Sequence, residues 1–67
     1  MDEVKYPNVS VDLIGQDGNA FLILGRVMKE MRRGGVSAEG IEDFRKDATS
    51  GDYDNLLRVV MNYVMVV

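Results

Sequence analysis

The sequence predicts a small α+β domain, mostly α, in which an N-terminal strand is followed by three helices and a short C-terminal strand. Residues 9–14 alternate between apolar and polar side chains through residue 13, as a half-buried strand does. Residues 19–33, 37–49 and 50–62 carry apolar side chains at spacings of three and four, which is typical of amphipathic helices. Residues 63–67 are mostly β-branched or aromatic and favour a strand. A third helix that continues through Val64 is the alternative.

Length and composition bound the domain and its partners. The 67 residues form one small domain, 1–67, and a chain of this length buries only about 60% of its unfolded surface. The sequence contains no cysteine and no histidine, which excludes disulfides and cysteine zinc sites and removes the commonest general base. Small domains without disulfides or a structural metal are often stabilised by forming oligomers. We therefore predict a homo-oligomer, a dimer or a tetramer, that holds no metal and no cofactor.

The charge balance excludes further classes of function. Eight basic and 11 acidic residues give a net charge of −3, which argues against a long nucleic acid as partner. We see neither a secretory leader nor an apolar run near the roughly 20 residues of a membrane span, so we expect a cytoplasmic protein without a membrane partner. No Ser–His or Cys–His pair is available for nucleophilic chemistry, and the acidic clusters are typical of solvated faces. We therefore expect no enzyme.

An arm, a strand and a turn are predicted at the start of the chain. Residues 1–7 are expected to form a flexible arm. Val9, Val11 and Leu13 would line one face of the strand, whose partner is either the C-terminal tail of the same chain or a strand of another subunit. Residues 15–18 then break the strand, because Asp-Gly tolerates positive φ angles.

The first helix is predicted over residues 19–33. Asp17 or Asn19 caps its start, and glycines 34–35 end it. Gly25 costs roughly 1 kcal/mol relative to alanine and is compatible with a close approach by another helix, a ligand or a subunit. The expected apolar face consists of Ala20, Leu24, Val27, Met28 and Met31, with Phe21 beside it.

The second and third helices are expected to be shorter. Ser37 is the expected N-cap of the second, which ends near Ala48 or Thr49. The third is capped by Ser50 or Asp52. The apolar stripe of the second helix consists of Ile41, Phe44 and Ala48, and that of the third consists of Leu56, Leu57, Val60, Met61 and Val64.

Neither of two familiar ligand loops matches the turn at residues 15–18. An EF-hand counted from Asp12 places Asp17 at the sixth position, where glycine is needed, and Ile23 at the twelfth, where glutamate is needed. The dinucleotide fingerprint and the Walker pattern also fail. The helix starts at residues 18–20 and 51–53 nevertheless offer backbone amides to an anion. Ordinary capping is the alternative, which the residues alone favour.

A basic cluster follows in the first helix, formed by Arg26, Lys29, Arg32 and Arg33. A solvated face near a helix C-terminus is one interpretation. Contacts to phosphates or bases are the other, because the planar guanidinium of arginine binds phosphate in a bidentate way. The tyrosines that can stack on bases, or pack instead, are Tyr6, Tyr53 and Tyr63.

Two motifs carry a family resemblance. Gly-Gln-Asp-Gly-Asn-Ala-Phe occupies residues 15–21, and Ser-Gly-Asp-Tyr-Asp occupies residues 50–54. Together they resemble a widespread group of small phage and prophage proteins over residues 9–64. These proteins typically show a strand, a helix opened by Asp-Gly-Asn-Ala-Phe, a basic helix end, and Ser-Gly-Asp-Tyr-Asp before a final helix.

The chain is also similar to a family of anti-CBASS sponges, which are small tetrameric proteins that bind a cyclic dinucleotide. The similarity lies in its size, its expected oligomeric state and its resemblance to small viral proteins. This resemblance implies a phage immune-evasion protein that sequesters a cyclic dinucleotide defence signal, without hydrolysing it, in the infected host cell. Helix-start amides and arginines would hold the phosphates, and tyrosines would stack on the bases. The predicted ligand-binding residues are Gly18, Asn19, Arg26, Arg33, Ser50 and Tyr53.

The alternative function belongs to a different class. The chain would be a small protein-interaction or inhibitor module that acts on a host or phage protein through apolar helix faces. An exposed apolar patch would favour this alternative, whereas buried arginines around an interface cavity would favour the sponge.

Overall fold

Two short strands and three helices make up the part of the chain that the computed structural model describes, residues 4–13 and 19–67. Their order is β1 (Tyr6–Val11), α1 (Ala20–Arg33), α2 (Ala38–Ala48), α3 (Tyr53–Tyr63) and β2 (Val64–Val66). The strands pair in parallel, with an irregularity between Tyr6 and Ser10. This arrangement confirms the predicted α+β class, including the short C-terminal strand, and it settles that β1 finds its partner within the same chain.

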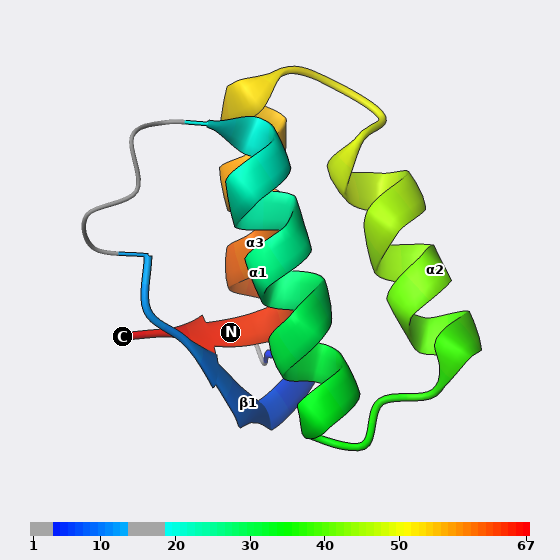
Figure 1. Cartoon of the computed structure of the whole chain (residues 1–67). Helices are drawn as coiled ribbons and strands as arrows, with labels where there is room; N and C mark the ends of the chain where they lie inside the picture. The colour runs from blue at the N-terminus through cyan, green and yellow to red at the C-terminus, as the bar shows by residue number, and fades with distance from the viewer. Residues whose placement is uncertain (1–3, 14–18) are drawn as a thin grey trace.

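Short connections make successive helices run in opposite directions, so α1 and α3 share one direction and α2 runs against them (Figure 1). The sheet lies at one end of the helices, and the starts of α1 and α3 lie at the other. Residues 19–21 and 51–54, which belong to the two motifs, therefore come to the same end of the molecule. None of the helices in the described ranges is long and apolar enough to cross a membrane.

Side-chain caps define the three helix starts. Asn19 caps α1, and its side-chain oxygen accepts hydrogen bonds from two amides of the first turn. Ser37 caps α2 and Asp52 caps α3 in the same way. Each bond satisfies an amide that has no acceptor within its helix. Of the candidate caps that the sequence left open, Asp17 lies outside the described residues, and Ser50 is not the cap of α3.

The end of α1 is also explained by local chemistry. Gly34 is the C-cap, and its amide donates to the carbonyl of Glu30 at 2.9 Å. Gly35 follows with a φ of +88°, a left-handed conformation that favours glycine over other residues. The chain then turns directly into α2, so the predicted role of the glycine pair is confirmed.

One hydrophobic core lies between the helices and the sheet. Val9 and Val11 of β1 are buried, as predicted, and Leu13 is half-buried. The stripe predicted for α2 is confirmed in full, because Ile41, Phe44 and Ala48 are all buried. The core residues are Val9, Val11, Ile23, Val27, Met31, Ile41, Phe44, Ala48, Leu56, Val60, Tyr63 and Val64.

The predicted face of α1 is partly wrong. Ile23, Val27 and Met31 face the core. Apolar residues cover more than one side of this helix, so spacing alone does not select the buried side, and contacts with β1, α2 and α3 decide it. Of the other residues predicted for this face, Leu24 and Met28 are half-buried and Ala20 is exposed, and Phe21, which was expected beside the face, is also exposed.

The bounds of the strands also differ from the prediction. β1 begins at Tyr6, so the last two residues of the predicted arm, residues 1–7, belong to the sheet. The amide of Lys5 donates to the carbonyl of Asn62 at 3.0 Å, which ties the chain before β1 to α3. β1 ends at Val11 rather than at residue 14. The ends of β1 are set by its pairing with β2. The alternation of apolar and polar residues within one strand does not specify the partner strand, so these ends could not be predicted from it.

The end of α3 decides between the two alternatives for the C-terminal tail. The helix stops at Tyr63 and Val64 begins β2, so the alternative of a helix through Val64 is wrong. Leu56 and Val60 are buried, as predicted for α3. Met61 is wrong as a core residue, because it is 56% exposed.

Candidate functional site

A cleft opens where the start of α1, the end of α2 and the start of α3 meet. Its volume is about 240 Å³, and most of its lining is apolar. We call it the helix-start cleft. The described residues that line it are Ala20, Phe21, Leu24, Ala48, Thr49, Gly51, Asp52, Tyr53 and Leu56.

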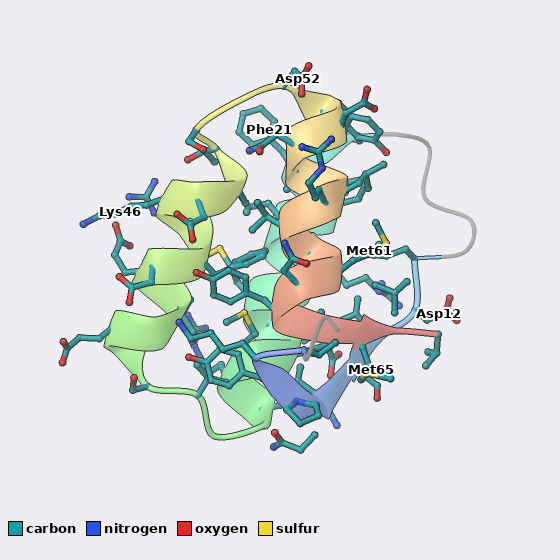
Figure 2. All side chains as sticks on the ribbon, turned by 180° about the vertical axis from the view of Figure 1, so that it is seen from behind. Asp12, Phe21, Lys46, Asp52, Met61 and Met65 are labelled. Carbon is teal, nitrogen blue, oxygen red and sulfur yellow. The ribbon has the colours of Figure 1, made fainter. Side chains whose placement is uncertain are left out.

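Two aromatic side chains of the cleft are exposed to solvent. Phe21 is 84% exposed and Tyr53 is 38% exposed. Figure 2 shows Phe21 and Asp52 together at this end of the molecule. Full burial of a phenylalanine side chain stabilises by about 1.5–3 kcal/mol, and Phe21 gains little of this within its own chain. Its ring is therefore available to a binding partner.

Polar side chains fix the loop beside the cleft. The hydroxyl of Thr49 donates to the Arg45 carbonyl, and the hydroxyl of Ser50 donates to the Asp47 carbonyl, each at 2.7 Å. The side-chain amide of Asn55 donates to the same Asp47 carbonyl at 3.1 Å and to the Ser50 hydroxyl at 3.4 Å. These bonds hold the wall of the cleft in place, and they engage Ser50 within the protein.

The charge beside the cleft is acidic. Asp52 lines it, and Asp54 lies exposed in the first turn of α3. The carboxylate of Asp52 accepts a hydrogen bond from the backbone amide of Asn55 at 3.0 Å. No lysine or arginine is among the described lining residues. Arg45, in the last turn of α2, is paired with Glu42.

The predicted ligand-binding residues do not form one site. Asn19, Ser50 and Tyr53 come to the helix-start end, but only Tyr53 lines the cleft. Asn19 and Ser50 are engaged in the cap and the loop. Gly18 lies outside the described residues. The sequence pairs the two motifs only as a family signature, whereas the structure brings them to the same end of the molecule and adds an apolar lining that was not predicted.

The two predicted arginines lie away from the cleft. Arg26 is exposed on α1. Arg33 follows seven residues later, about 10 Å further along the helix, beside a shallow polar hollow shared with Ser10 of β1. Its guanidinium pairs with Glu30 at 3.6 Å, and the side chain of Arg33 is 71% exposed. These positions fit a solvated basic face better than a shared anion site.

Of the described residues that line the cleft, only Tyr53 is among the predicted ligand-binding residues, and Phe21 is one of those that the prediction misses. The sequence predicts Phe21 only as a neighbour of the apolar face of α1. Its place in the Asp-Gly-Asn-Ala-Phe motif was a usable signal. The solvent exposure of Phe21 could not be predicted from the sequence, because it depends on how α1 is rotated against the other elements.

Comparison with known proteins finds no family model that matches the chain, no similar curated protein and no similar solved structure. The resemblance to phage proteins and to the sponges therefore stays a prediction. Within residues 4–13 and 19–67, no group of three acidic side chains lies close enough to hold a metal ion. The function is inferred below from the geometry of the helix-start cleft.

Proposed function

We propose that this protein is a small, non-catalytic protein-interaction module whose helix-start cleft accepts an apolar side chain of a host or phage partner. One observation carries the proposal, namely that Phe21 is 84% exposed at the mouth of a mostly apolar cleft. Protein interfaces concentrate their binding energy in a few aromatic or aliphatic anchors seated in such hollows.

The size of the cleft favours one side chain over a whole small molecule. Pockets that enclose drug-sized ligands measure about 300–1,000 Å³, whereas the helix-start cleft measures about 240 Å³. A large aliphatic or aromatic side chain fits this space. The rings of Phe21 and Tyr53 then extend the contact beyond the cleft itself.

Sequestration of a cyclic dinucleotide in the cytoplasm of an infected host cell is the second candidate. It is favoured by the placement of Phe21 and Tyr53 beside two helix starts, since aromatic rings stack on bases and helix starts attract phosphates. The volume of one cleft requires a second copy to complete the site, and symmetric oligomers supply such sites.

We propose a homo-oligomer on a separate observation. Met61, Met65 and Val66 are each at least 41% exposed on α3 and β2. Among the described residues, β2 pairs only with β1, and an edge strand with apolar side chains promotes association. Light scattering at micromolar concentration tests this proposal, and a monomer would contradict it.

A peptide selection tests the interaction function. Random 12-residue peptides displayed on a carrier are selected on the wild-type protein and then measured on two variants. Phe21→Ser should abolish their binding. Leu22→Ser is the matched control, because Leu22 is the next residue and is 57% exposed but does not line the cleft. Peptides that bind both variants equally well would contradict the proposal.

A nucleotide panel tests the second candidate. The protein is heated with cyclic di- and trinucleotides, and its melting temperature is recorded. A ligand at 100 times its Kd adds about 2.7 kcal/mol to the stability of the folded state. If none of the nucleotides raises the melting temperature, sequestration is contradicted. The release of intact ligand after heating would distinguish sequestration from hydrolysis.

A further inference from the structure

We infer that the partner segment of the helix-start cleft carries lysine or arginine beside its apolar anchor. This inference rests on the proposed interaction function and adds the chemical class of the partner. The apolar lining selects the anchor, and the charges around the opening select what flanks it.

The charge at the cleft is negative. Asp52 lines it and Asp54 is exposed in the first turn of the same helix. The cap bond of Asp52 uses Oδ1, so Oδ2 can accept a hydrogen bond from an ammonium or guanidinium group. A basic side chain next to the anchor can therefore pair with Asp52 and is attracted by the nearby charge of Asp54, whereas an acidic side chain is repelled.

The positive charges of the described residues lie outside the lining of the cleft. Arg32 and Arg33 lie in the last turn of α1, about 20 Å from its start for a helix of 14 residues. Lys46 lies on α2 away from the labelled Phe21 and Asp52 (Figure 2), and it does not line the cleft. Arg26 and Arg58 lie closer, within two turns of the starts of α1 and α3, but neither is among the described residues that line the cleft. The charge within the described lining is therefore negative only, which favours a basic partner there.

The charge of the partner distinguishes this inference from its rivals. A neutral apolar segment would bind without dependence on Asp52 or Asp54. An anionic ligand, such as a cyclic dinucleotide, would bind more tightly when these two carboxylates are removed. A basic segment should bind more weakly.

The experiment uses the peptides selected on the full chain and a double variant, Asp52→Asn with Asp54→Asn. Asparagine caps a helix about as well as aspartate, so α3 is retained, and melting curves check this. Enriched peptides should hold a large apolar residue within a few positions of lysine or arginine. The double variant should bind them about fivefold to tenfold more weakly at low salt, and with less dependence on salt.

Glu39→Gln is the matched control, because Glu39 is also an exposed acid in a first helical turn but belongs to the start of α2 and does not line the cleft. It should leave the affinity unchanged. Peptides that need Phe21 but are neutral or acidic, or that bind the double variant as tightly as wild type, overturn the inference and leave the interaction function standing. If no peptide depends on Phe21, the interaction function itself fails. Tighter binding of a cyclic dinucleotide to the double variant also overturns the inference.

Discussion

The hydroxyl of Tyr63 on α3 donates a hydrogen bond to the carboxylate of Asp47 on α2 at 2.6 Å. Tyr63 is 8% exposed, and its ring meets the edge of Phe44 with 5.3 Å between centroids. The ring of Tyr6 lies 6.2 Å away, and Nζ of Lys5 lies 5.2 Å above the Tyr63 ring. One side chain therefore connects α2, α3 and the start of β1. Of the three tyrosines, only Tyr53 remains exposed for a ligand.

Alkaline pH should weaken the fold through Tyr63. Burial, and next the hydrogen bond to Asp47, raises the pKa of Tyr63 from 10.0 to about 12. The folded state thus holds this proton more tightly than the unfolded chain, so the stabilisation is complete below pH 10.0 and is lost as the pH rises through about 12.

Tyr63→Phe tests this dependence. At neutral pH we expect a loss of about 1 kcal/mol in the free energy of unfolding, because the hydrogen bond is removed and the exposed Asp47 returns to water. The alkaline loss should also be smaller than in wild type. Urea unfolding across this pH range measures both effects. Tyr53→Phe is the control, and equal alkaline losses in wild type and Tyr63→Phe would contradict the assignment.

The cap of α3 should contribute measurably to stability. Asp52→Ala removes the acceptor of the Asn55 amide and should lower the free energy of unfolding by about 1 kcal/mol. Asp52→Asn should retain most of that stability, because its side-chain oxygen accepts the same bond. Chemical denaturation compares the two. A similar loss in both variants would show that charge, and not capping, is responsible.

Two glycines, Gly25 within α1 and Gly34 at its C-cap, should respond in opposite directions to alanine. No described atom outside the local helix backbone lies within 4 Å of a Cβ placed on Gly25, so Gly25→Ala should stabilise the domain by up to about 1 kcal/mol through helix propensity. A Cβ on Gly34 would lie 2.7 Å from Cγ2 of Val9. Gly34→Ala should therefore cost about 1–3 kcal/mol.

Thermal unfolding of the two glycine variants provides the measurement. A gain of stability in both would mean that β1 moves away from Gly34 without cost. A loss of stability in Gly25→Ala would support the predicted close approach of another chain or a ligand at Gly25. The described part of this chain makes no such approach.

Neighbouring valines of β2 should differ in their contribution to stability. Val64 is 1% exposed and Val66 is 41% exposed. Val64→Ala removes two buried methyl groups and leaves a cavity, so we expect a cost of about 2 kcal/mol. Val66→Ala should cost clearly less. Equal effects in urea unfolding would contradict the packing of β2 against the core.

The local elements could be predicted because their signals are local. Ser37, with an apolar stripe behind it, specifies the start of α2 whatever the rest of the chain does. The glycine pair after Arg33 specifies the end of α1 in the same way. The rotation of α1 could not be predicted, because Ile23 and Leu24 are equally apolar and only packing selects between them.

The amino-acid sequence alone specifies the class of fold, the three helices with the cap of α2 and the candidate caps of α1 and α3, and two motifs that each begin a helix. The tertiary structure decided that β1 pairs with β2, and that Asn19 and Asp52 stand at one end of the molecule. It also decided that Phe21 lies in solvent beside a cleft while Arg26 and Arg33 lie elsewhere. Caps and periodicity act over one or two turns of chain, whereas the cleft exists only because α1 and α3 run in the same direction.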